Sequence, residues 1–239
     1  SYPMILEIHG GPYAMYGPFF GSEIQRYAAE GYVTVWVNPR GSTGYGQDFA
    51  LGIDLAYPGY DYDDLMTVVD AVVAKQYAAP DRLFVTGGSG GGILTAWITT
   101  KTQRFAAAAS IKPVINWMTM ALAADIGQYV RRHWIRADPW SDPEAFLKHS
   151  PIRYVDKVKT PTLIMVGEED YRTPAWEAEQ YYTALKMLKI DTALIRVPGA
   201  PHYIASRPSR LVGKTDNIMG WFAKYDPDKQ KPEEMTPKP

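Results

Sequence analysis

The chain has 239 residues, 46% of them hydrophobic, with 25 Lys and Arg residues against 26 Asp and Glu residues and a formal net charge of −1. This length and apolar content favour one large domain with its own core, and the balanced charge argues against nucleic acid or a membrane surface as a partner. Because the sequence has no cysteine, disulfides, thiolate metal sites and a cysteine nucleophile are excluded. No run of about 18 apolar residues and no signal-peptide pattern is found, so we expect a soluble domain whose compartment stays unknown.

Short apolar runs rich in β-branched residues alternate with segments that have helical spacing of apolar residues. In chain order we predict a strand at 4–8, a helix at 22–30, a strand at 33–37, a helix at 64–75, a strand at 83–86, a helix at 91–100, strands at 106–111 and 162–166, a helix at 174–188, a strand at 192–197 and a helix at 216–225. Several of these strands are apolar on both faces, which is typical of buried parallel strands. The alternation predicts an α/β fold, a mostly parallel sheet with helices on both faces and ligands at the carboxyl ends of the strands.

Two segments interrupt this alternation. Residues 114–156 combine aromatic residues and helix formers with several prolines, and are predicted to form a helical insertion over the sheet. Residues 226–239 interleave charged residues with proline, cannot bury apolar surface, and are predicted to be a disordered tail. We therefore expect one domain over 1–225 that includes the insertion.

A glycine-rich turn with a central serine joins the predicted strand 83–86 to the helix 91–100. Its sequence, Gly87-Gly88-Ser89-Gly90-Gly91, fits the pattern G-x-S-x-G, which between a strand and a helix is typical of a nucleophile elbow. The outer glycines are needed because strand and helix pass too close for a Cβ atom, and the turn strains the serine backbone. The run matches no phosphate-loop pattern, so we predict that Ser89 is a nucleophile.

A serine nucleophile needs a histidine base and an acid that orients it, in the chain order Ser, Asp, His for this architecture. Of the four histidines, His9 precedes the elbow, and His133 and His149 lie within the predicted insertion. Only His202 follows a late strand, in a turn rich in proline and glycine. We therefore predict His202 as the general base.

The predicted acid, Asp170, is the last of three consecutive acidic residues after the strand 162–166. Such a run can also be a solvated turn. The loop after this strand must reach the His202 loop, however, and Asp170 stands in the chain order that a hydrolase triad requires.

The loop after the first predicted strand, 9–12, has the sequence His-Gly-Gly-Pro. It is similar to the HGGG-type loops of esterases, whose amides face the substrate. We predict Gly11 and Gly90 as the donors of an oxyanion hole, Gly90 at a helix N-terminus. His9 is predicted to shape this loop rather than to act as a base.

Five segments together resemble the catalytic domain of the prolyl oligopeptidase family. They are residues 9–12, 38–46, 87–91, 167–174 and 198–209, and the similarity extends over about residues 2–225. Within the family the chain looks most like the acylaminoacyl-peptidase and dipeptidyl-peptidase branch. The resemblance implies an α/β-hydrolase fold and serine peptidase activity on short peptides, with Ser89, Asp170 and His202 as the triad.

The resemblance also implies a substrate pocket. Arg172 would hold a backbone carbonyl of the peptide, and Val114 and Trp117 of the insertion would line an apolar pocket for P1, the residue before the scissile bond. The residues by themselves leave other interpretations open. An arginine beside a carboxylate commonly forms an ion pair, and a tryptophan is commonly part of an ordinary core.

Three features depart from the family pattern. No β-propeller precedes the hydrolase segment, and two strands that usually precede the oxyanion loop are missing, so we expect a fragment of a longer enzyme. An exposed edge strand would then favour a homo-oligomer or association with the missing segments. Pro201 and Tyr203 flank His202 where small residues are expected, which puts the triad geometry in question.

Three functional hypotheses remain. The first is a serine peptidase with an apolar P1 preference, the second is a carboxylesterase with the same triad, and the third is an inactive fragment or hydrolase-like binding module. No metal or cofactor is expected, because the acidic run at Asp61, Asp63 and Asp64 lacks the glycine and distal glutamate of a calcium loop and is predicted to start a helix. The sequence does not tell whether free or acylated N-termini are recognised.

Overall fold

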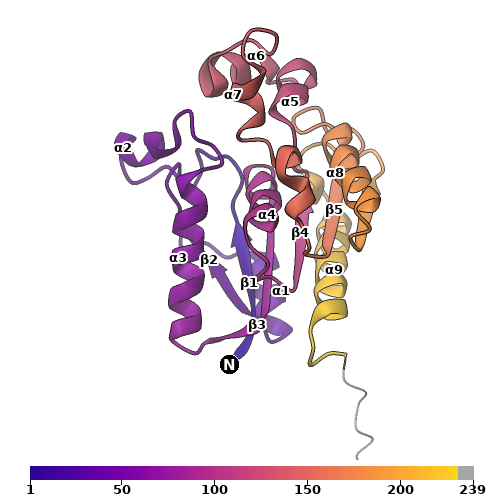
Figure 1. Ribbon diagram of the computed structural model, residues 1–239. Coiled ribbons are helices and arrows are strands. Elements are labelled where there is room, and N and C mark those ends of the chain that lie inside the picture. The colour runs from indigo at the N-terminus through magenta and orange to yellow at the C-terminus, as the bar shows by residue number, and fades with distance from the viewer. Residues whose placement is uncertain (231–239) are drawn as a thin grey trace, which may run out of the picture.

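A parallel sheet forms the centre of the fold in the computed structural model, which describes residues 1–230 (Figure 1). Its strands are β1 (Tyr2–Ile8), β2 (Val33–Trp36), β3 (Ala78–Gly88), β4 (Ala107–Ile111), β5 (Thr162–Gly167) and β6 (Thr192–Val197), in the order β2-β1-β3-β4-β5-β6. Every neighbouring pair is parallel. The predicted strands are confirmed, and only β3 differs clearly, since it begins at Ala78 rather than at residue 83.

The helices follow the strands in the predicted alternation. They are α1 (Ser22–Ala29), α2 (Gln47–Ala50), α3 (Tyr60–Ala74), α4 (Gly90–Lys101), α5 (Trp117–Ala123), α6 (Gly127–Tyr129), α7 (Pro143–Leu147), α8 (Ala175–Met187) and α9 (Pro208–Tyr225). Short 3-10 turns lie at Leu51–Ile53, Pro151–Lys157 and Ile204–Ser206, and a π-helix spans Val130–Ile135. The acidic run lies at the start of α3, where Asp61 and Asp63 occupy the first turn. The helix α9 begins eight residues before its predicted start at residue 216.

Helices cover both faces of the sheet, as predicted. Alternate residues of a strand point to opposite faces, and Leu6 of β1 packs in one buried cluster with α3 and α4, whereas Ile5 packs in another with α1 and α9. On β5, Ile164 packs in a third cluster with α8. The strands are apolar on both sides because both sides are covered.

The segment between β4 and β5 forms the predicted helical insertion, with α5, α6, the π-helix and α7. In Figure 1, α5, α6 and α7 lie at the end of the molecule opposite the N-terminus. This is the end where the parallel strands finish, so the insertion lies over the edge at which α/β sheets bind ligands.

The beginning of the predicted tail has a defined place. Asp226 is fully buried, and its carboxylate accepts the guanidinium of Arg82 on β3 at 2.7 and 2.9 Å. Ordered contacts therefore continue beyond Tyr225, and the predicted tail residues 231–239 lie outside the described residues. Among residues 1–230, the structure has no helix with the length and apolar character needed to cross a membrane.

Candidate active site

The turn between β3 and α4 holds Ser89 in an unusual backbone conformation. Its φ of 59° and ψ of −116° lie outside the regions that residues other than glycine usually adopt. The Ser89 amide donates to the Ile111 carbonyl at the end of β4, at 3.0 Å. A Cβ atom would lie 2.1 Å from the Ile8 carbonyl oxygen if placed on Gly91, and 2.6 Å from it if placed on Gly87. Backbone from two neighbouring strands therefore encloses the turn, which explains the glycines at its ends.

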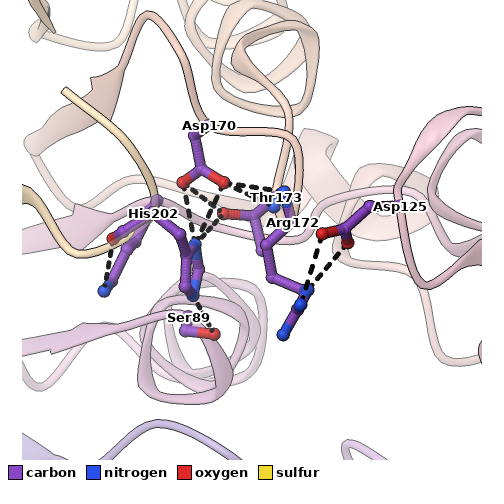
Figure 2. A network of polar contacts seen from close by, with 7 residues as sticks. Ser89, Asp125, Asp170, Arg172, Thr173 and His202 are labelled. Atoms are coloured by element: carbon purple, nitrogen blue, oxygen red, sulfur yellow. Dashed lines mark hydrogen bonds and ion pairs between the residues drawn. The ribbon is translucent and has the colours of Figure 1, made fainter. Parts of the chain in front are cut away.

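Three side chains from distant loops meet at this turn (Figure 2). Ser89 Oγ lies 3.0 Å from Nε2 of His202, and Nδ1 of His202 lies 2.8 Å from Oδ2 of Asp170. An ionised carboxylate only accepts hydrogen bonds, so Nδ1 donates to Asp170 and Nε2 is free to accept the Ser89 hydroxyl. The structure brings together the three residues predicted as a triad, with Pro201 and Tyr203 in place beside His202.

Asp170 is fixed by several donors in a buried position. Its side chain has 0% of its area exposed, and Oδ1 accepts the backbone N–H groups of Arg172 and Thr173 at 2.9 Å each, while Oδ2 accepts the Thr173 hydroxyl at 3.1 Å. Burial by itself raises the pKa of this carboxyl, but His202 and the N–H donors outweigh burial and hold the pKa below its ordinary value. Asp170 is therefore ionised at neutral pH.

The loop after β1 lies against the elbow. A Cβ atom on Gly90 would lie 2.9 Å from the Gly11 nitrogen, so the two glycines predicted as oxyanion donors are neighbours. Gly11 has a φ of 128°, which favours glycine, and Gly90 is the first residue of α4, where N–H groups have no acceptor within the helix. His9 contacts Ser42 Oγ at 2.9 Å, a contact between two loops that fits a loop-shaping residue better than a base.

A cavity of about 450 Å³ is open to Ser89. Its polar side is formed by the elbow, the oxyanion loop and the acid and base loops, and its apolar side by α4, the loop before α3 and the insertion. The lining residues are Gly11, Ser89, Gly90, Arg172, Thr173 and His202, together with Tyr57, Ile93, Val114, Trp117, Met120, Ile126, Tyr129 and Trp134. Val114, Trp117 and Arg172, the residues predicted for the substrate pocket, all belong to this lining. No carboxylate contributes to it among residues 1–230.

Arg172 reaches the cavity while paired with the insertion. Its Nε and Nη2 donate to the two carboxylate oxygens of Asp125 at 2.7 and 3.2 Å (Figure 2). The hydrogen bond to Asp125 raises the pKa of Arg172 above its ordinary value. The ion pair that the residues alone suggested is present, and it holds the guanidinium at the cavity.

Several lining residues were not identified from the sequence. Tyr57 lies in the loop before α3, and its hydroxyl donates to the Gly90 carbonyl at 2.9 Å. Only the following Pro58 marks this position, as a loop, and no local pattern connects it to the elbow. Met120 and Ile126 of the insertion carried no signal either. Thr173 stands inside the segment 167–174 that carries the family resemblance, and this could have identified it.

An aromatic wall limits the depth of the cavity. The Trp117 and Trp134 rings meet edge to face with centroids 5.3 Å apart, and the Tyr57 ring lies 6.0 and 6.1 Å from them. A second cavity of about 110 Å³ is lined by the same three residues and by His149. The three rings therefore separate the Ser89 cavity from additional space behind it.

Residues 1–230 contain no group of three or more His, Cys, Asp or Glu side chains that could hold a metal ion. The chemistry that this site can perform rests on the serine, the imidazole, the carboxylate and the neighbouring amides.

Comparison with known proteins gives a consistent picture. A family model described as "Prolyl oligopeptidase family" matches residues 18–227. The chain is similar to the uncharacterized peptidase YuxL of Bacillus subtilis, with 41% identity over 228 residues that make up 94% of this chain and 35% of that protein. It is also similar to the acylamino-acid-releasing enzyme of Arabidopsis thaliana, with 32% identity over 231 residues, 93% of this chain and 30% of that protein.

Among solved structures, acylaminoacyl peptidase from Pyrococcus horikoshii has a similar fold, with a TM-score of 0.90 and 31% identity. The match covers 97% of this chain and 38% of that one. The chain thus spans about a third of the length of the relatives it matches.

Proposed function

This chain belongs to the prolyl oligopeptidase family, and we propose that it is a serine peptidase that hydrolyses short peptides through an acyl-enzyme. The observation that carries the proposal is the continuous contact from Asp170 through His202 to Ser89 beside an open cavity. A serine hydroxyl without a base is a weak nucleophile, and an imidazole oriented by a buried carboxylate removes that limit.

In the proposed reaction Ser89 Oγ attacks the scissile carbonyl carbon while Nε2 of His202 takes the hydroxyl proton. Asp170 holds the imidazole in the required tautomer and stabilises its cationic form. The amides of Gly11 and Gly90 donate to the oxyanion that develops on the carbonyl oxygen. His202 then protonates the leaving amine, and a water molecule activated in the same way hydrolyses the acyl-enzyme and restores Ser89.

The cavity lining supports an apolar P1 residue. Val114, Trp117 and Trp134 form an apolar surface beside Ser89, and Arg172 offers N–H donors for a peptide carbonyl. We therefore propose a peptidase with an apolar P1 preference, of the acylaminoacyl-peptidase or dipeptidyl-peptidase type.

A carboxylesterase is the second candidate. The pairing with Asp125 favours it, because two of the three guanidinium nitrogens of Arg172 are engaged there and fewer N–H groups remain for a peptide carbonyl. An ester needs only the triad, the oxyanion donors and the apolar wall. Turnover of matched peptide amides and p-nitrophenyl esters distinguishes the two, and cleavage of esters alone would overturn the peptidase proposal.

The first experiment is labelling with a fluorophosphonate, read by intact mass. We expect one adduct on the wild-type chain, none on Ser89→Ala, strongly slowed labelling of His202→Ala, and normal labelling of a Ser141→Ala control, since Ser141 is exposed and far in sequence from the elbow. Absence of an adduct on the wild-type chain would instead favour the inactive, hydrolase-like binding module.

We also propose that β2 pairs with a further strand, from a second copy or from the rest of a longer chain. β2 is at the edge of the sheet, and Trp36 at its end is 42% exposed. An unpaired edge offers backbone donors and acceptors to another strand. Light scattering over a concentration series tests pairing between copies. Trp36→Lys should weaken the association between copies. A monomer at every concentration would exclude pairing between copies.

A further inference from the structure

Lys112 lies directly after β4, next to the backbone that holds the nucleophile. Its φ of 44° is in the left-handed region, which is costly for a residue with a side chain and persists where the surroundings hold it. The Lys112 amide donates to the Met165 carbonyl of β5, and the carbonyl of the preceding Ile111 accepts the Ser89 amide. The backbone at this point is therefore fixed to the neighbouring strand on one side and to the elbow on the other.

The side chain of Lys112 connects the elbow to the loop that carries His202. This loop, residues 198–207 between β6 and α9, is called the histidine loop below. A Cβ atom on Gly88 would lie 3.0 Å from Lys112 Cε, so the aliphatic stem packs on the residue before Ser89. The ammonium donates to the carbonyl oxygen of His202 at 2.8 Å. That oxygen also accepts the Ile204 amide at 3.1 Å, but this second bond lies within the loop and moves with it.

Two other contacts of the histidine loop are made to the segment after β5 rather than to the elbow. The Ala200 carbonyl accepts the Glu169 amide at 3.0 Å, and the imidazole is oriented by Asp170, so both contacts tie the loop to the segment after β5. The Lys112 bond ties the backbone of His202 to the strand next to the elbow. Beside the direct contact of Nε2 with Ser89 Oγ, this bond relates the position of the His202 backbone to the position of the nucleophile.

Holding a lysine here is costly. The pKa of Lys112 is lowered to about 8, chiefly by desolvation and also by the charge of Lys214, although Asp170 and Glu23 act in the opposite direction. An apolar side chain of similar length would fill the same space without burying an ammonium group. The donor therefore provides something that packing alone does not.

We propose that Lys112 is a positioning residue that holds the His202 backbone at the distance from which the imidazole reaches Ser89. The inference rests on the proposed function, because it takes His202 as the general base. Lys112 itself touches neither substrate nor reacting atoms. A histidine loop released from Lys112 would keep its contact with Asp170 but sample positions in which the 3.0 Å contact between Nε2 and Ser89 Oγ is broken.

The test compares Lys112→Met, which keeps the stem and removes the donor, with Lys101→Met. Lys101 is a matched control because it ends α4, lies over the rings of Trp97 and Tyr154, and is also partly desolvated, which lowers its pKa. We expect Lys112→Met to lower kcat, and the rate of fluorophosphonate labelling, by about tenfold or more. KM should change little, since the cavity lining is intact, and Lys101→Met should match the wild type in both constants.

Hydrogen exchange provides a readout that does not need turnover. In Lys112→Met the amides of residues 202–206 should exchange faster than in the wild type, while those of β3 and β4 keep their protection, which also shows that the variant is folded. Unchanged kcat and unchanged exchange in the loop would overturn the proposal. If the wild-type chain is neither labelled nor active, the proposed function fails, and the exchange comparison still decides whether Lys112 holds the loop.

Discussion

Asp125 orients the side chain of Arg172, because it accepts from two of the three guanidinium nitrogens. Both partners are nearly half exposed, at 46% and 43% of their side-chain area, and an ion pair of this kind contributes at most about 1 kcal/mol. We expect Asp125→Asn to raise KM for peptide amides by about threefold to fivefold, in line with that limit, through a less ordered Arg172.

A p-nitrophenyl ester of a simple aliphatic acid, which contains no peptide group, distinguishes this role from general damage to the site. It has no peptide carbonyl for Arg172 to hold, so its KM should stay unchanged in Asp125→Asn. Glu144→Gln, which breaks the exposed pair of Glu144 with Arg153 in the same insertion, is the control. Equal losses on amide and ester would show that Asp125 supports the insertion rather than Arg172.

Gly91 and Gly213 are both glycines within helices, but their surroundings differ. A Cβ atom on Gly91 would lie 2.1 Å from the Ile8 carbonyl oxygen, whereas one on Gly213 would meet no heavy atom within 4 Å. We expect Gly91→Ala to lower the free energy of unfolding by about 2–3 kcal/mol and to abolish fluorophosphonate labelling. Gly213→Ala should raise the free energy of unfolding by about 0.5–1 kcal/mol through better helix propensity. Urea denaturation measures both, and a normally labelled Gly91→Ala would contradict the close approach at the elbow.

At the scale of elements, periodicity predicted the sheet well because parallel strands buried on both faces leave long apolar runs. It failed where an element begins without such a run. β3 starts in Ala78-Ala79-Pro80-Asp81, which lacks β-branched residues, and its early part is recognisable only from the pairing of Ala78 with Tyr2. α9 starts at Pro208, and Gly213 weakens the helical signal before the buried Ile218 restores it.

The candidate site likewise contains residues whose position follows from the predicted strands and residues whose position does not. Ser89, Asp170 and His202 each follow a predicted strand, so topology places them at one edge of the sheet, where their side chains meet. Tyr57 and Trp134 reach the cavity only through the folding of a long loop and of the insertion. The π-helix at Val130–Ile135 that carries Trp134 has no sequence signature, so the depth of the pocket was not predictable.

That π-helix leads to a prediction about substrate size. Trp134 lines both cavities, of about 450 and 110 Å³, and Trp134→Leu should join them without removing the apolar surface. We expect the ratio of kcat/KM for a P1 naphthylalanine to that for a P1 phenylalanine to rise by about tenfold, the effect of a few added methylene-sized contacts. A panel of acylated peptide amides measures it.

Trp140→Leu is the control for this change, since Trp140 is 75% exposed and lines neither cavity. Its substrate ratio should equal that of the wild type. If Trp134→Leu left the ratio unchanged while keeping its activity, the second cavity would not be accessible from the Ser89 side.

At the scale of the whole molecule, one carboxyl group joins three elements on the face opposite α3 and α4. Glu7 of β1 interacts with Glu23 of α1 and Lys214 of α9, and those two form an ion pair at 2.6 Å. The pKa of Glu7 is raised from 4.5 to about 8, chiefly by burial and also by Glu23, although Lys214 and the Tyr27 hydroxyl lower it. In the folded protein Glu7 therefore keeps its proton at a pH where the unfolded chain has lost it.

The sign of the pH dependence follows from that difference. Between about pH 4.5 and pH 8 the folded state binds more protons at Glu7 than the unfolded state, so this residue makes the free energy of unfolding fall as pH rises. Glu7→Gln has no proton to lose, and we expect it to exceed the wild type in stability by more than about 1 kcal/mol at pH 8, with the gap shrinking toward pH 5. Urea denaturation of both chains at several pH values measures the gap, and since the other titrating groups are common to both chains, the difference isolates Glu7.

Glu144→Gln, an exposed position, is the control, and its curve of unfolding free energy against pH should run parallel to that of the wild type. A parallel curve for Glu7→Gln as well would mean that Glu7 is ionised in the folded protein and held by Lys214.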